Sequence, residues 1–257
     1  MSSTIIITLV IAGIVFLLSL GYLNNVLEKN TLNKGRRKAQ LIDRQRRCAT
    51  LSETLPGQLV SVELKQLLNR IELKLSDELS ALDPKNTACK ARADQLRELI
   101  GQGQALPVSN TPLAIASETQ IKDVRFQLES LQAQIVRAAE EKVISGVEGK
   151  KWLGQVRHML VSVYIDYFNA IGGDFLAQKR ANQARLVFER AVQFLKKQKN
   201  PAPYQQSLVE FEALLAQAKS LSAEQTQPNA RQGNELIAAV AQEDEDDAQW
   251  KKKQMYD

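Results

Sequence analysis

The sequence predicts an all-α fold, in which an N-terminal transmembrane helix precedes a cytoplasmic helical bundle. The 257 residues include only 12 Gly and 7 Pro, and they are rich in Leu, Ala, Gln, Lys and Glu, which lose little freedom in a helix. Apolar residues recur at three- and four-residue steps along most of the chain, as in helices with one buried face. A long uncharged N-terminal segment predicts the transmembrane helix.

This uncharged segment, residues 4–23, reads TIIITLVIAGIVFLLSLGYL. A helix of that length, at about 1.5 Å per residue, spans the hydrocarbon core of a bilayer. A cleaved signal peptide would begin with basic residues and end at a small-residue cleavage site, whereas this chain begins Met-Ser-Ser-Thr-Ile and continues Tyr22-Leu23-Asn24-Asn25. We therefore expect residues 1–28 to form an uncleaved anchor rather than a signal peptide or a buried core helix.

Residues 29–55, called the neck below, are expected to form a basic juxtamembrane helix. Eight cations and one anion, Asp43, give residues 29–47 a charge of +7, whereas the whole chain carries +5. No Lys or Arg precedes the anchor, so the positive-inside rule places the N-terminus outside and the body in the cytoplasm. The cations are Lys29, Lys34, Arg36, Arg37, Lys38, Arg44, Arg46 and Arg47.

The neck has three candidate roles, of which a topology signal is the simplest. Contact with anionic lipid headgroups is the second, because each juxtamembrane cation can gain roughly 1 kcal/mol from an anionic leaflet. Nucleic acid is the least favoured partner, since no aromatic residue is interleaved to stack on bases. The candidate membrane-surface contacts are Lys34, Arg36, Arg37, Lys38, Arg44, Arg46 and Arg47.

Residues 56–101 are expected to form a helical hairpin. Ser61 caps a first helix with an apolar stripe, and Asp83-Pro84 opens a second one that runs to about Ile100. A linker at residues 102–116 contains glycine and two prolines, which mark a boundary between two subdomains. The residues expected to be buried are Leu64, Leu68, Ile71, Leu75, Leu79 and Leu82 in the first helix and Ala88, Leu96 and Leu99 in the second.

Residues 117–221 are expected to form a second helical domain that begins at a capping box, Ser117 with Gln120. The apolar residues that follow, between Ile121 and Ala138, keep heptad a/d spacing for fewer than three heptads. A helix packed within a bundle is favoured over a coiled coil, but self-association through residues 121–138 stays open. The a/d residues are Ile121, Val124, Leu128, Leu131, Ile135 and Ala138.

Three further helices complete this domain. Ser145 and Glu148 repeat the capping-box pattern before an apolar helix that is expected to end at Gly172-Gly173. A further helix then carries Phe175 and the apolar residues from Ala184 to Leu195, and the last one follows Asn200-Pro201.

The stretch Ala184-Arg-Leu-Val-Phe188-Glu-Arg-Ala191 resembles the second helix of a tetratricopeptide repeat, and Tyr164–Gly173 resembles its first helix. The resemblance covers residues 152–200 at most, without a second copy at a 34-residue period. It implies a helical module that binds peptides. The chain as a whole resembles uncharacterised bacterial single-pass inner-membrane proteins, which implies a location and no activity.

No motif predicts catalysis, a cofactor or a metal. Gly149-Lys150-Lys151 lacks the first glycine of a phosphate-binding loop. With two cysteines and one histidine, a structural zinc site cannot be assembled. His158 and Asp166 are expected to be structural, Asp166 as part of a buried ion pair with a cation such as Arg185.

Residues 222–257 are expected to form a disordered acidic tail, because Ser, Glu, Gln, Pro and Asn dominate it. Trp250 and Tyr256 follow the acidic run of residues 243–247 and are candidate docking residues, since an aromatic anchor beside charge is typical of docking peptides. The sequence thus predicts a membrane-anchored adaptor or accessory protein that binds an unidentified protein. The alternatives are a structural homo-oligomer and, less favoured, a nucleic-acid-binding protein.

Overall fold

The computed structural model describes the backbone of residues 3–224 and the side chains of residue 25 and residues 28–223. Seven α-helices and three short 3-10 helices make up these residues, and no strand occurs among them. The predicted all-α class is therefore confirmed for the described chain. By their contacts, the residues form two units: unit 1 contains residues 3–113 and 123–159, and unit 2 contains residues 114–122 and 160–224.

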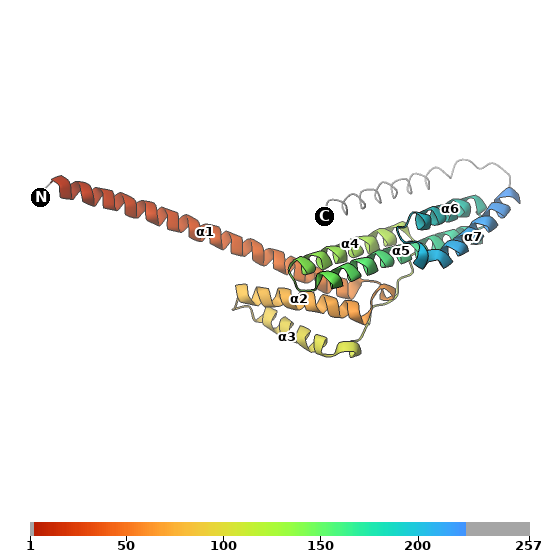
Figure 1. Ribbon diagram of the computed structural model, residues 1–257, viewed down its shortest axis with the longest axis horizontal. Coiled ribbons are helices and arrows are strands. Elements are labelled where there is room, and N and C mark those ends of the chain that lie inside the picture. The colour runs from red at the N-terminus through yellow and green to blue at the C-terminus, as the bar shows by residue number, and fades with distance from the viewer. Residues whose placement is uncertain (1–2, 225–257) are drawn as a thin grey trace. The chain divides into compact units, whose positions relative to one another are not determined.

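Helix α1 (Ser3–Thr54) is a single unbroken helix of 52 residues (Figure 1). The uncharged segment 4–23 lies in the part of α1 whose side chains are outside the described residues, so the transmembrane assignment stays a prediction. Where side chains are described, no helix has both the length and the apolar character needed to cross a membrane.

Unit 1 is built on the C-terminal part of α1. Helix α2 (Val62–Leu82) packs on α1, and α3 (Thr87–Gly101) packs on α2 (Figure 1). The Ser61 side chain accepts a hydrogen bond from the Leu64 amide and so caps α2 as predicted. Helix α3 begins later than expected, because Asp83 ends α2 and the Asn86 side chain caps α3 instead. Ala88 is exposed, so it is not a core residue.

The predicted linker is held in place against the end of α1. The Asn110 side chain donates to the backbone oxygens of Ser52, Glu53 and Leu55 at 2.9–3.1 Å. The Ser52 and Glu53 oxygens are orphan carbonyls at the C-terminus of α1, which need donors from outside the helix. Gly57 donates to the Thr111 oxygen at 2.9 Å. The linker, with its 3-10 turn Gly103–Ala105, therefore belongs to the packed structure of unit 1 up to residue 113.

Helices α4 (Glu118–Glu140) and α5 (Gly146–Ala177) follow the linker. Ser117 and Ser145 each accept a hydrogen bond from an amide three residues on, which confirms both predicted caps. The parts of α4 and α5 from residue 123 to residue 159 belong to unit 1 with α1–α3, a grouping that the sequence did not indicate. The a/d residues Val124, Leu128, Leu131, Ile135 and Ala138 are all buried, so α4 is a bundle helix.

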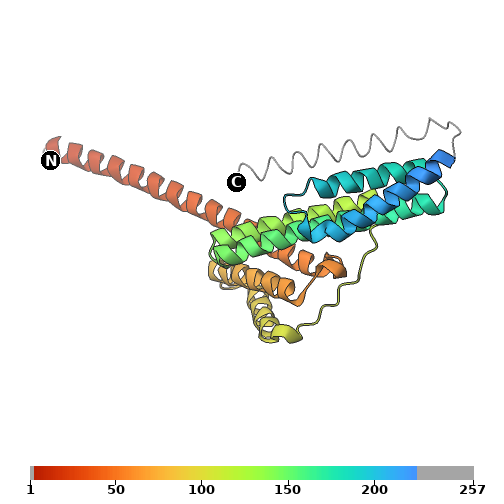
Figure 2. The same ribbon diagram turned by 45° about the vertical axis from the view of Figure 1, so that its right-hand side comes forward.

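Unit 2 contains the C-terminal part of α5 with α6 (Ala181–Lys196) and α7 (Gln205–Glu224) (Figure 2). The prediction that Gly172-Gly173 ends α5 is wrong, since the helix continues to Ala177 and includes Phe175. Gly172 instead gives room to a ring, because a Cβ there would lie 2.4 Å from Phe188 Cε1. The turn comes at Lys179, which has a positive φ of 59°.

Candidate functional site

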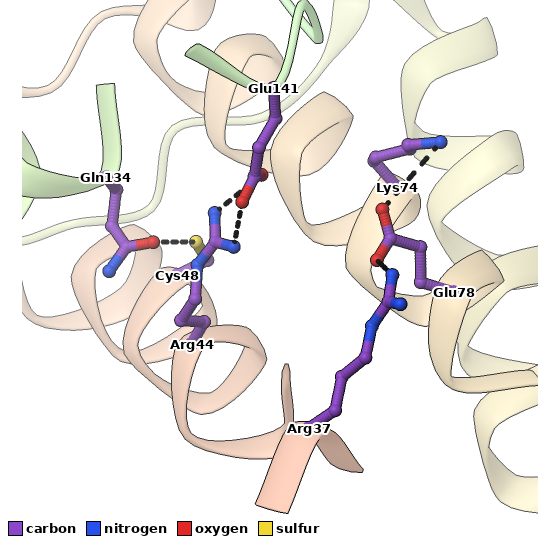
Figure 3. A network of polar contacts seen from close by, with 7 residues as sticks. All are labelled: Arg37, Arg44, Cys48, Lys74, Glu78, Gln134 and Glu141. Carbon is purple, nitrogen blue, oxygen red and sulfur yellow. Dashed lines mark hydrogen bonds and ion pairs between the residues drawn. The ribbon is translucent and has the colours of Figure 1, made fainter. Parts of the chain in front are cut away.

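The candidate membrane-surface contacts in the neck of α1 all fall among the described side chains. The neck cations that pair with a carboxylate are Arg37, Lys38, Arg44 and Arg47. Arg44 is buried, and its guanidinium donates two hydrogen bonds to Glu141, at 2.5 Å and 2.9 Å. Figure 3 shows this pair between α1 and the end of α4. A bidentate pair of this kind fixes both side chains. The expectation that Arg44 contacts lipid headgroups is therefore wrong, because its charge is neutralised inside unit 1.

Arg37 and Lys38 bind carboxylates at the C-terminal end of α2. The Arg37 guanidinium lies 3.3 Å from a carboxylate oxygen of Glu78. The same carboxylate forms an ion pair with the Lys74 ammonium group at 3.8 Å (Figure 3). Lys38 donates to Asp83 at 2.6 Å. That hydrogen bond raises the pKa of Lys38 and lowers the pKa of Asp83, as expected when each partner favours the charged form of the other. Both pairs are partly exposed and contribute little to stability.

The remaining neck cations point into solvent. Arg47 makes an exposed pair with Asp43, four residues earlier, at 2.8 Å. Lys29, Lys34, Arg36 and Arg46 are exposed, and no ion pair joins them to any side chain that the structure describes. Of the seven candidate headgroup contacts, Lys34, Arg36 and Arg46 keep an uncompensated charge.

Beside Arg44, the neck contributes a thiol to the core. Cys48 is fully buried, and its Sγ lies 3.8 Å from the Gln134 Oε1 (Figure 3). Burial, with a smaller contribution from the nearby Glu72 carboxylate, raises the pKa of the Cys48 thiol to about 12. A thiol of this kind is a packing residue without nucleophilic reactivity at neutral pH.

A second buried polar group of unit 1 was not predicted. Glu72, only 2% exposed, accepts two hydrogen bonds from Arg92 of α3, at 2.6 Å and 3.0 Å. Ser76 accepts from Gln45 of α1 at 2.9 Å. Asn69, Glu72 and Ser76 are all buried and follow each other at three- and four-residue steps. The sequence could have indicated these buried polar residues, because they form a stripe beside the apolar stripe of α2. Nothing in the sequence indicates that Arg92 is the partner of Glu72.

The two residues considered for catalysis, His158 and Asp166, both lie on the surface of α5. His158 is exposed on α5. Asp166 is also exposed, although neighbouring atoms remove part of the carboxylate's hydration and thereby raise its pKa. No ion pair with Arg185 occurs among the described side chains, and the Arg185 Nε is buried without a hydrogen-bond partner. The expected buried Asp166 pair is therefore absent from unit 2.

Aromatic rings form the core of unit 2, which includes the segment that resembles a tetratricopeptide repeat. The Tyr164 and Phe194 ring centroids lie 4.8 Å apart, and Phe168 lies edge-on to Phe194 at 5.9 Å. Phe211 of α7 completes the group, 6.1 Å from Phe188. These rings are packing residues, and an ion pair between Lys196 and Glu212 joins α6 to α7 at 2.7 Å.

The described residues contain neither a metal site nor the predicted docking residues of the tail. Within residues 28–223, His, Cys, Asp and Glu form no group that could hold a metal. Four large apolar side chains of the described residues are more than half exposed: Leu32 (55%), Phe126 (67%) and Val147 (81%) in unit 1, and Val209 (56%) in unit 2. Trp250 and Tyr256, the candidate docking residues of the tail, lie outside the described residues. So does the predicted disordered acidic tail from residue 225 on, whereas its first residues, 222–224, belong to α7.

Comparison of the chain with models of protein families, with curated proteins and with solved structures finds no match. The function is therefore argued from the sequence and the structure alone.

Proposed function

We propose that this protein is an adaptor or accessory subunit of an assembly at the bacterial inner membrane. Residues 4–23 of α1 cross the membrane with the N-terminus outside, and both units lie in the cytoplasm and bind another protein. The observation that carries the proposal is the continuity of α1, because the uncharged segment, the basic neck and a core-forming segment share one helix.

Continuity has a mechanical consequence. Leu41 is the first buried residue of the described part of α1. Arg37 and Lys38 already pair with Glu78 and Asp83 at the end of α2. Residues 24–36 therefore extend about 20 Å between the uncharged segment and the packed helices of unit 1, at about 1.5 Å per residue. A helix that is fixed at both ends holds unit 1 at a set distance from the bilayer, where it can meet a partner that projects from the same membrane.

The distance of each neck cation from the uncharged segment indicates which of the candidate roles of the neck is favoured. If α1 stands upright, Lys29 lies about 9 Å beyond residue 23, and Arg36 about 20 Å beyond it. Charges more than about 8–10 Å from a surface are largely screened at physiological ionic strength. The neck therefore acts chiefly as the topology signal, with lipid contact concentrated at Lys29. Nucleic acid is disfavoured because Arg37, Lys38, Arg44 and Arg47 are already paired.

Contact with another protein is supported by the surfaces rather than by a cleft. The exposed Phe126 and Val209 each offer an apolar contact on a different unit, and aromatic residues are enriched in the energetic centres of interfaces. The acidic tail with Trp250 offers a third surface. Oligomer formation through residues 121–138 is not part of the proposal, because that face is buried.

The test is affinity capture of the full-length protein from native membranes, with copurified proteins quantified by mass spectrometry. Three variants locate the contact: removal of residues 225–257, which leaves α7 complete, Phe126→Glu and Val209→Glu. A stoichiometric partner that is lost with one variant only would support the proposal and assign the surface. A protein that elutes without any stoichiometric companion in all preparations would contradict it.

A further inference from the structure

Helix α3 is held in unit 1 by a small apolar contact. Figure 1 and Figure 2 both show it at the edge of the unit, packed on α2. Of its 15 residues only Ala93 and Leu96 are buried, whereas nine of the 21 residues of α2 are buried. Hydrophobic stabilisation grows with the apolar area that is removed from water, so burial holds α3 much less firmly than it holds α2.

Two ion pairs also join α3 to α2. Arg92 donates to the buried Glu72 carboxylate at 2.6 Å and 3.0 Å, and Arg97 donates to Asp77 at 2.7 Å. The exposed Arg97–Asp77 pair adds little stability. At Glu72, the attraction to the guanidinium is largely offset by the hydration that the buried carboxylate loses. Neither pair therefore makes α3 costly to detach.

The segment that contains α3 lies between two residues that are held in place. Lys38 of the neck binds Asp83, the residue at the end of α2, at 2.6 Å, and Leu106 is buried after the helix. Gly101 ends α3 and Gly103 begins the next turn, and a Cβ on either would meet nothing within 4 Å. A few residues at element ends are enough to form a hinge. Residues 84–105 can therefore move while α2 and the linker from Leu106 on keep their places.

The neck reaches the start of α3 through Asp83. Its carboxylate binds Lys38, and its backbone oxygen accepts a hydrogen bond from the Asn86 amide at 3.1 Å. The Asn86 side chain in turn caps α3, because it accepts from the amides of Ala88 and Cys89. These contacts form a continuous path from α1 to the first turn of α3, so the position of the neck affects how α3 is held.

We propose that α3 is a flap, which leaves α2 while the rest of unit 1 stays folded, and that the neck holds this flap closed through Lys38. Elements with few buried apolar contacts are the ones that open locally in folded proteins. An isolated helix of 15 residues is only marginally stable in water, so α3 loses helical hydrogen bonds when it opens. Opening uncovers Glu72, and a displacement of the neck thereby changes the surface that α2 presents. The flap does not depend on the proposed anchor.

Hydrogen exchange of the full-length protein in detergent, measured by mass spectrometry of peptides, tests the flap. Protection factors should be about tenfold or more lower in residues 91–100 of α3 than in residues 66–79 of α2. Arg92→Ala should raise exchange in α3 several-fold and leave α2 unchanged, because the unpaired Glu72 carboxylate regains water only in the open state. Arg70→Ala is the matched control, since Arg70 pairs with Glu148 of α5 instead. Equal protection of α2 and α3 would overturn the flap.

Control by the neck has its own pair of variants. Lys38→Ala should raise exchange in residues 91–100 by roughly two- to fivefold, the effect of one partly exposed ion pair. Lys34→Ala removes an exposed neck cation and should leave this exchange unchanged. Maleimide labelling of the half-exposed Cys89 thiol should rise with the exchange, because opening uncovers the first turn of α3. Equal exchange and equal labelling in the two variants would overturn the control by the neck.

Discussion

Two adjacent glycines of α5 have opposite surroundings. A Cβ on Gly172 would lie 2.4 Å from the Phe188 ring, whereas a Cβ on Gly173 would meet nothing within 4 Å. Both are in mid-helix, where Gly→Ala alone is favourable by up to about 1 kcal/mol. The same substitution therefore has opposite expected effects at the two positions.

We expect Gly172→Ala to destabilise unit 2 by about 1–3 kcal/mol through overpacking, and Gly173→Ala to be neutral or stabilising. Urea unfolding of the full-length protein in detergent, followed by circular dichroism, measures both. Adding Phe188→Leu to Gly172→Ala should restore part of the loss, because the smaller side chain relieves the contact. Equal midpoints for the two single variants would show that the ring does not need Gly172.

Removal of a carboxylate should cost more stability at the Arg44–Glu141 pair, where Arg44 is buried, than at an exposed ion pair of the same helix. Glu141→Ala leaves the buried Arg44 guanidinium without its partner, which should cost about 2 kcal/mol of unfolding free energy. The matched control is Asp43→Ala, which removes an exposed partner of Arg47 and should cost less than about 0.5 kcal/mol. Urea unfolding followed by the fluorescence of Trp152, a buried residue of unit 1, reports the difference. A similar loss for both variants would contradict the buried pair.

The two thiols should differ in reactivity. At pH 8 a maleimide should modify Cys89 of the native protein and should modify Cys48 only after unfolding, which mass spectrometry of peptides can establish. The raised pKa of Cys48, about 12 against an ordinary 9.0, also makes the stability of the fold depend on pH. Above about pH 9 the unfolded chain loses this proton while the folded chain keeps it, so stability falls as the pH rises. A Cys48→Ala variant should lose part of this pH dependence.

At the scale of elements, hydrogen bonds from the linker hold the C-terminal end of α1 in place. Asn110→Ala removes the donor to the backbone oxygens of Ser52 and Glu53 in α1 and of Leu55 just after it, and we expect a loss of about 1–2 kcal/mol because the part-buried Ser52 and Leu55 oxygens lose their partner. Thr111→Ala is the control, since the Thr111 side chain is exposed and only its backbone oxygen binds Gly57. Hydrogen exchange at residues 52–57 should increase in the first variant only. Unchanged hydrogen exchange in the Asn110→Ala variant would show that the Asn110 hydrogen bonds do not hold the end of α1 in place.

The helices themselves were predictable where local chemistry decides them. Ser61, Ser117 and Ser145 act as caps because their side chains bind amides three residues away. The end of α5 was not predictable, since Gly172 gives room to the Phe188 ring instead of ending the helix, and the turn uses Lys179 in a conformation that favours glycine. Long-range pairs were also invisible, because nothing near Arg44 in the sequence indicates that Glu141, 97 residues later, neutralises it.

At the scale of the molecule, the division into units follows from contacts rather than from composition. The glycine and proline of residues 102–116 suggested a boundary there. The chain does pass from unit 1 to unit 2 within this linker, after residue 113. However, Asn110 ties the first part of the linker to α1, and Gln134 of α4 reaches Cys48 of α1, so residues 123–159 belong with the N-terminal helices. Helix α1 is thus the element on which unit 1 depends, and the proposed anchor gives the same helix a second role.

The most direct test of this account is the accessibility of Cys89 combined with alkaline extraction of membranes. A membrane-impermeant maleimide is applied to intact spheroplasts and to inverted vesicles, with Cys48 labelled only after unfolding as the internal control. The account predicts a protein that alkaline pH does not release, and labelling of Cys89 in inverted vesicles but not in spheroplasts. Release at alkaline pH, or labelling of Cys89 from outside, would contradict a cytoplasmic body anchored by α1.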